Sequence, residues 1–101
     1  MELKNKRKAE LIKMLNREKR DLKKYIKDIA NEDITISDVN FIYIEFNEIE
    51  KYCDTLISEL EHRGLSNSDM GSIGVYNELC GVLRVKMRKV ENRLYDEMLG
   101  A

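Results

Sequence analysis

Few residues in this chain have the types and spacing that catalysis or metal binding requires. Cys53 and Cys80 are far apart with no Cys-x-x-Cys motif, and His62 is the only histidine. No nucleophile has a base at a recognisable spacing. The run Gly71-Ser72-Ile73-Gly74 lacks the lysine of a phosphate-binding loop. The sequence therefore predicts a protein that is not an enzyme and that carries no metal site and no cofactor.

A basic stripe is the first candidate for binding chemistry. Its five cations recur at three- and four-residue steps: Lys13, Arg17, Arg20, Lys24 and Lys27. On a helix they share one face over about 21 Å, a length that could follow phosphates or an acidic protein. No aromatic residue interleaves them, and several acidic residues do, as on an ordinary solvated face. Nucleic-acid binding is therefore an alternative hypothesis, and steering of a protein partner is the preferred one.

Three glycines mark the second candidate, in the last apolar segment of the chain. A glycine inside a helix costs roughly 1 kcal/mol relative to alanine, so a cluster of them favours a close approach by another helix or by a ligand. With Ile73 and Tyr76 turned inward, an outer face of small and apolar residues results: Gly71, Gly74, Val75, Gly81, Val82 and Val85. Such a face indicates self-association or partner binding. In a second alternative, the glycines admit a small ligand such as a nucleotide to an oligomer interface, where Tyr76 or Arg84 contacts it.

A second apolar patch is expected near the start of the middle helix. Its members are Ile34, Ile36, Phe41, Tyr43 and Ile44. It is either an exposed contact surface or a surface that the preceding connection covers. Lys19 occupies a core position, where we expect its stem to lie over the core edge and its charge to stay in water. The two cysteines also occupy core positions, and we expect them to behave as small hydrophobes, not as a disulfide.

The elements that position these residues are three helices within a single domain, 1–101. Apolar residues recur at alternating three- and four-residue steps over about 2–30, 38–63 and 67–99. The three inner stripes are as follows: Ile12, Leu15, Lys19, Leu22, Ile26 and Ile29; Val39, Ile42, Phe46, Ile49, Cys53, Leu56 and Leu60; Ile73, Tyr76, Cys80, Leu83, Met87, Val90 and Leu94. The chain contains no proline that would interrupt them.

The registers of the stripes match. Paired in antiparallel order, facing positions such as 29/39 and 15/53 have residue numbers with a constant sum, so the layers meet at equal height. The fold class predicted is all-α: an antiparallel three-helix up-down-up bundle with a coiled-coil-like heptad core, self-associating. Ser37 is expected to cap the second helix, Gly64 to end it in a left-handed conformation, and Ser66 with Asp69 to form a capping box. Strand-like composition at 34–46 conflicts with this assignment.

Charge is strongly segregated along the chain. Residues 1–30 hold 11 Lys and Arg against 5 Asp and Glu, whereas residues 31–63 hold 2 against 9. The whole chain has a net charge of -1. We therefore expect the first two helices to attract one another and to set their mutual orientation.

These features predict a cytoplasmic, oligomeric protein–protein interaction module without membrane contact. The chain has no apolar run that could span a bilayer and no apolar signal segment after its first residues. Size and composition also fit an accessory protein of a phage or mobile element that inhibits a target by stoichiometric binding. The partner would be a second copy, another protein, or both.

Overall fold

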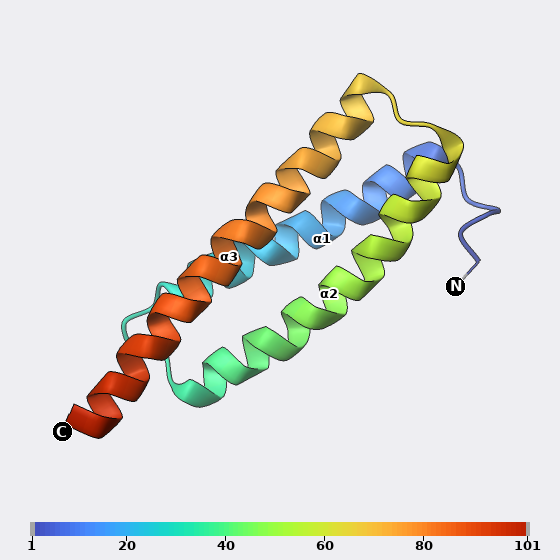
Figure 1. Cartoon of the computed structure of the whole chain (residues 1–101). Coiled ribbons are helices and arrows are strands. Elements are labelled where there is room, and N and C mark those ends of the chain that lie inside the picture. The colour runs from blue at the N-terminus through green and yellow to red at the C-terminus, as the bar shows by residue number, and fades with distance from the viewer. Residues whose placement is uncertain (1, 101) are drawn as a thin grey trace.

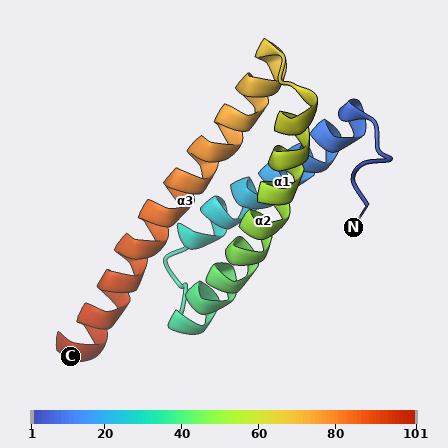
Figure 2. The same cartoon turned by 45° about the vertical axis from the view of Figure 1, so that its right-hand side comes forward.

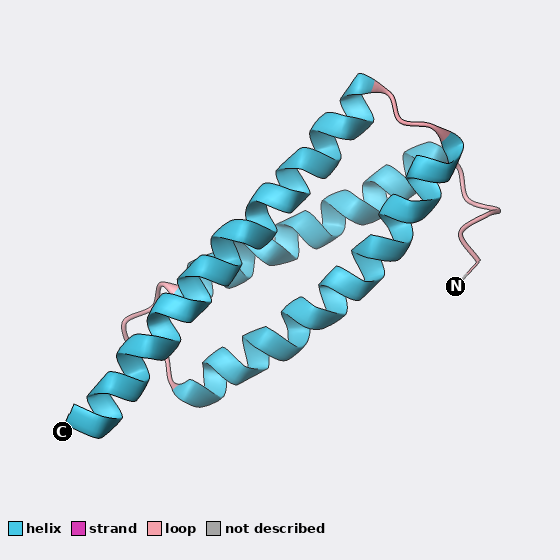
Figure 3. Ribbon diagram, viewed as in Figure 1, coloured by secondary structure: helices cyan, strands magenta, loops and turns pink. Residues whose placement is uncertain are grey.

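Three antiparallel helices form an elongated bundle in the computed structural model, which describes residues 2–100. They are α1 (Lys8–Ile29), α2 (Ile36–Arg63) and α3 (Asn67–Gly100), and they run up, down and up as expected (Figure 1). No strand occurs between residues 2 and 100, and loops are confined to the N-terminal segment and two short connections (Figure 3). The strand-like composition at 34–46 is therefore overridden, because helical spacing within α2 buries Val39, Ile42 and Phe46 in the core.

The first helix begins six residues later than the sequence predicts. Residues 2–7 form an irregular segment that folds back over the end of the bundle, so that Leu3 is only 5% exposed. Arg63, at the end of α2, holds this segment by donating hydrogen bonds to the carbonyl oxygens of Leu3, Lys4 and Lys6, at 2.7, 3.2 and 2.5 Å. The carbonyl oxygens of this segment thus accept hydrogen bonds from Arg63. In the helix that the apolar spacing predicts, they would accept from backbone N–H groups four residues later.

The second helix is capped by Thr35 and not by Ser37. The Thr35 hydroxyl accepts from the backbone N–H of Asp38, and the Asp38 carboxylate accepts from the N–H of Thr35. This reciprocal pair places Ser37 inside the first turn. At the other end, Gly64 has the expected positive φ of 89°, but its ψ of 136° is extended and not left-handed helical.

The third helix starts as predicted. Ser66 and Asp69 form a capping box, in which the Ser66 hydroxyl accepts from the Asp69 N–H at 3.1 Å and the Asp69 carboxylate accepts from the Ser66 N–H at 2.9 Å. The connection between α2 and α3 is therefore short and closed by side-chain contacts.

The core follows the predicted stripes most faithfully in α2, where all seven stripe residues are buried. In α1, Leu15, Lys19, Leu22 and Ile29 are buried and Ile12 and Ile26 are half-buried, while Leu11 is a fully buried residue that the heptad pattern missed. In α3, the four central stripe residues are buried, whereas Ile73, Val90 and Leu94 are half-buried.

The last turns of α3 extend past the turn that joins α1 to α2, as two views show (Figures 1 and 2). Because α1 has ended at Ile29 and α2 begins at Ile36, these turns have no neighbouring helix. The side chains of Tyr95, Met98 and Leu99 are correspondingly exposed. Along the bundle, α3 packs more extensively against α1 than against α2.

Candidate binding surface on α1 and α3

The small-residue face lies on the outside of α3. Val75, Val82 and Val85 are 44%, 38% and 52% exposed, Gly71 and Gly74 are exposed, and Gly81 is half-buried. A Cβ atom added to any of the three glycines would have no other atom within 4 Å, beyond the helix's own backbone. No helix within the protein therefore approaches α3 closely enough to require glycine at these positions. The three residues stay unexplained by packing inside one copy.

The basic stripe divides between two places. Lys13, Arg17 and Arg20 line a groove between α1 and α3 together with four other residues: Asn16, Lys19, Lys23 and Val75. Lys24 lines a different hollow at the α1–α2 turn, and Lys27 is exposed in the last turn of α1. The helical spacing placed Lys19 in the core stripe and did not include Lys23. The structure brings both into the groove with the three cations of the stripe.

Lys19 also lines this groove, and the residue as a whole is 9% exposed. Its ammonium group donates to the Ser72 hydroxyl of α3 at 2.5 Å, and that hydroxyl lies 3.4 Å from the Asn16 side-chain oxygen. The pKa of Lys19 is lowered, chiefly by burial and also by the nearby charge of Lys23. The ammonium group is only partly buried in this contact. The stem lies over the core edge as expected, but the charge is drawn inward to α3.

The second apolar patch is split by the fold. Ile34 is buried in the core cluster, and Ile36 and Tyr43 are half-buried, whereas Phe41 and Ile44 remain exposed. Ile34 lies in the connection before α2, and its side chain is buried in the core, so this part of the patch is not exposed.

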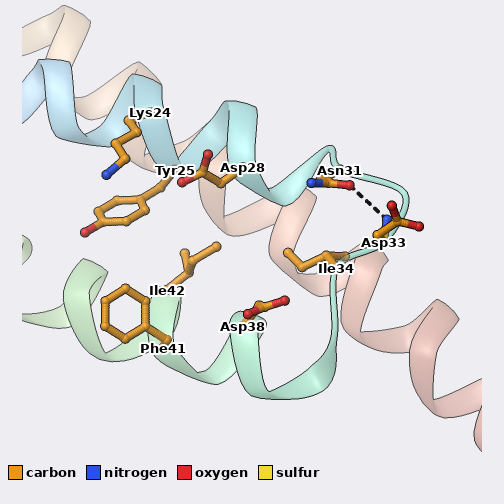
Figure 4. A pocket seen from close by; sticks show the side chains of 9 residues that line it. All are labelled: Lys24, Tyr25, Asp28, Asn31, Asp33, Ile34, Asp38, Phe41 and Ile42. Atoms are coloured by element: carbon orange, nitrogen blue, oxygen red, sulfur yellow. Dashed lines mark hydrogen bonds between the residues drawn. The ribbon is translucent and has the colours of Figure 1, made fainter.

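The hollow beside Phe41 has a volume of about 300 Å³ and lies between the end of α1 and the start of α2. Tyr25 of α1 lies across from Phe41 and Ile42 of α2, and three aspartates surround the opening (Figure 4). Two of its polar side chains serve the turn itself. Asn31 accepts from the backbone N–H of Asp33 at 2.9 Å, and Asp38 belongs to the capping box of α2.

Tyr76 and Arg84, which the small-ligand hypothesis places at the glycine face, are engaged elsewhere. Tyr76 is 3% exposed, and its side chain lies beside the two cysteines in the core. Arg84 donates to Glu50 of α2 at 2.7 Å and lies over the Phe46 ring, 5.3 Å from its centroid. Both residues join α3 to α2, so neither faces the surface that carries the glycines.

The expected attraction between α1 and α2 does not appear as ion pairs. Between residues 2 and 100 the ion pairs that join two helices are Lys8–Asp69 and Arg84–Glu50, and each involves α3. Four carboxylates instead line the α1–α2 groove with Tyr25, Ile49 and Tyr52: Glu18, Asp21, Glu45 and Glu48. Helix α1 is thus divided, with its acidic side toward the acidic helix α2 and its basic side toward α3.

The two cysteines lie in the core, and the described residues form no metal-binding cluster. Cys53 and Cys80 are both buried and free, and burial raises the pKa of each thiol, that of Cys53 to about 12. Thiolate is the reactive form, so these cysteines are inert in the folded protein. Within residues 2–100, no group of three His, Cys, Asp or Glu side chains could hold a metal ion.

Comparison of the chain with protein-family models, curated proteins and solved structures gives no match. None of the three helices in the described part of the chain combines the length and apolar character needed to cross a bilayer. The candidate surface is therefore defined by its own geometry: an apolar face on α3, bordered along Val75 by a basic groove against α1.

Proposed function

We propose that the protein is a non-enzymatic helical interaction module that self-associates through the outer face of α3. The observation that supports this is the open space at Gly71, Gly74 and Gly81, on a helix face that also exposes three valines. Three helical glycines together cost about 3 kcal/mol of helix stability, and no packing within one copy offsets it. A second helix lying close against this face would both use the glycines and bury the valines.

The charge of this face suits a second copy as the partner. Between residues 71 and 85 its members are the three glycines, the three valines and Glu78. A face with a single charged residue produces little repulsion when it meets its own copy. Most soluble homo-oligomers use a two-fold interface, in which the same patch serves both subunits.

The spacing of the face favours an antiparallel arrangement with the two-fold axis beside Glu78. In that register Gly74 lies opposite Gly81 of the second copy, and Val75 lies opposite Val82 of the second copy. The glycine side allows the two backbones to approach to the short end of the usual 8–10 Å range between helix axes. The valine side supplies apolar area that leaves water.

Sedimentation of the full chain tests the association. Gly81→Leu is expected to fill the close approach and to convert the oligomer to a monomer, with the helical circular dichroism unchanged. The matched control is Asn77→Leu, an exposed position of α3 outside the face, which should leave the oligomer intact. A wild-type chain that sediments as a monomer at all concentrations would contradict the proposal.

Cross-linking tests the direction of the two helices. Because both native cysteines are buried, new surface cysteines report on the interface alone. A mixture of Val75→Cys and Val82→Cys chains should give a mixed disulfide dimer faster than either chain alone. Rapid homodimers of Val82→Cys would instead show a parallel arrangement and exclude the axis at Glu78.

Stoichiometric inhibition by a phage or mobile-element accessory protein stays a prediction from size and composition, as does a cytoplasmic location. Nucleic-acid binding by the basic stripe also stays a prediction. That hypothesis assumes that the five cations of the stripe form one continuous face. Lys24 instead lines the hollow at the α1–α2 turn, away from the groove that holds Lys13, Arg17 and Arg20. If reversing the charge of Arg17 and Arg20 leaves affinity for DNA and RNA unchanged, the nucleic-acid hypothesis is lost.

A further inference from the structure

The groove between α1 and α3 holds a partly buried positive charge that no carboxylate within residues 2–100 pairs with. Lys19 is 9% exposed, and the partner of its ammonium group within residues 2–100 is the uncharged hydroxyl of Ser72. A buried ammonium group is costly unless an opposite charge or several acceptors compensate for it. One hydroxyl compensates the ammonium charge of Lys19 only weakly. The ammonium group can therefore take a further hydrogen-bond acceptor.

The rest of the groove increases this imbalance. Its lining comprises four further cations, an amide and one apolar side chain: Lys13, Arg17, Arg20, Lys23, Asn16 and Val75. No carboxylate lines it. Two acidic residues of α1, Glu18 and Asp21, lie close in sequence to these cations. They line the groove between α1 and α2 and do not pair with the cations. Five cations along about 15 Å of one helix therefore converge on a concavity without a counter-charge.

We propose that this groove is an anion site for a small ligand that carries phosphoryl groups. Arg17 and Arg20 supply planar guanidinium groups that can donate to two phosphoryl oxygens at once. Lys19 supplies a partly buried charge, and Ser72 and Asn16 supply neutral hydrogen-bonding groups beside it. The proposal does not require self-association, because one copy supplies all five of these side chains; Val75, at the edge of the groove, also belongs to the glycine and valine face.

The dimensions of the groove favour a small ligand over a nucleic-acid strand. Its volume of about 680 Å³ falls in the range of small-molecule sites. Strand-binding grooves pair their cations with aromatic side chains on which successive bases stack. The seven residues that line this groove include none.

Calorimetric titration of the full chain with inorganic pyrophosphate at low ionic strength tests the proposal. Wild-type protein should bind it, and Lys19→Met should weaken binding about tenfold or more while keeping the helical signal, because the stem that packs on the core is retained. The matched control is Lys27→Met, which removes an exposed cation of the same helix outside the groove. It should change the affinity less than about twofold, as expected for a screened surface charge.

Two results would overturn the proposal. One is no heat of binding for pyrophosphate with a wild-type chain that is folded. The other is an equal loss of affinity in Lys19→Met and Lys27→Met, which would mean diffuse attraction to the whole basic side of α1. A short single-stranded oligonucleotide serves as the competing probe, and if it binds more tightly than pyrophosphate and depends on Lys27, the strand hypothesis replaces the small ligand. Sedimentation of the same samples reports self-association separately.

Discussion

The ammonium group of Lys8, in the first turn of α1, lies 2.5 Å from a carboxylate oxygen of Asp69 at the start of α3. The same ammonium group donates to the carbonyl oxygen of Gly64 at 2.8 Å. Lys8 thus binds both ends of the short α2–α3 connection and ties them to α1. Asp69 also caps its own helix through Ser66, so one carboxylate closes the turn and joins two helices.

Acid should destabilise the bundle through this pair. The hydrogen bond from Lys8, followed by the backbone N–H of Ser66, lowers the pKa of Asp69 from 3.8 to about 2. A depressed carboxyl pKa contributes stability that is fully present above the unfolded value and is lost as the pH falls through the folded value. We therefore expect the loss between about pH 4 and pH 2 in urea unfolding followed by circular dichroism.

The variant Asp69→Asn measures how much of the loss of stability in acid comes from the Lys8–Asp69 ion pair. The variant should be less stable than wild type at neutral pH, and the difference should shrink toward pH 2 as the wild-type carboxylate is protonated. Asp38, whose pKa is also lowered by its capping contacts to Thr35, titrates in the same direction in both proteins and cancels from the comparison. An unchanged difference down to pH 2 would contradict the role of Asp69.

Arg63→Lys should release the N-terminal segment. Lysine cannot reproduce a planar guanidinium that donates to three carbonyl oxygens and to Glu59, so we expect a loss of about 1–3 kcal/mol. Residues 2–7 should then exchange amide hydrogens faster and be cleaved more readily by protease. Arg93→Lys is the control, because its contact with Glu97 is long and exposed, and it should change stability by less than about 0.5 kcal/mol.

The two cysteines should be unreactive until the protein unfolds. Burial raises the pKa of Cys53 to about 12 and that of Cys80 in the same direction, so the thiolate is scarce near neutral pH. Ellman's reagent should react slowly with the native chain and rapidly in denaturant. Val82→Cys, which adds an exposed thiol, provides the fast reference. One rapid equivalent in the native wild type would show that a cysteine opens to solvent.

Removing one carboxylate from the α1–α2 groove should stabilise the protein. Burial, and after it the neighbouring charge of Asp21, raises the pKa of Glu18, which shows that this group is ionised at some cost. Asp21→Asn should lower the repulsion on Glu18 and raise the free energy of unfolding by up to about 1 kcal/mol. The gain should decline with added salt. Glu32→Gln, in the exposed turn before α2, should show no comparable gain.

Neutralising Glu78 should strengthen self-association. In the proposed register this glutamate lies beside its own copy at the two-fold axis, and like charges brought together at an interface oppose binding. Glu78→Gln should lower the dissociation constant several-fold, by about 1 kcal/mol, in sedimentation at low salt. Glu61→Gln, on α2, should have no effect. Weaker association of Glu78→Gln would place the axis elsewhere.

Sequence patterning predicted the core most completely in α2. All seven positions of its apolar stripe are buried, whereas α1 and α3, which also pack against two helices, each leave stripe residues half-buried. The capping box of Ser66 and Asp69 was predictable because both partners are local. Thr35 was missed as a cap in favour of Ser37, since both residues are good caps and only the reciprocal bond with Asp38 decides between them.

Contacts between distant residues could not be predicted in the same way. Leu11 and Leu3 are buried outside the heptad pattern, and the helix expected from residue 2 begins at Lys8 because Arg63 holds the preceding carbonyls. The candidate groove was only half predictable. Helical spacing grouped Lys13, Arg17 and Arg20, but Lys19 and Lys23 joined them only when α3 closed one side of the groove.

The sequence by itself determined the number, order and direction of the helices, because helical periodicity, caps and short connections act over a few residues. It also determined that charge is divided between the first two helices. Only the tertiary structure decided which side of α1 meets which neighbour, because that rotation depends on core packing and not on net charge. Packing turns the acidic side of α1 toward an acidic helix and its basic side toward α3. The same rotation leaves the glycines and valines of α3 facing outward, with no partner inside one copy.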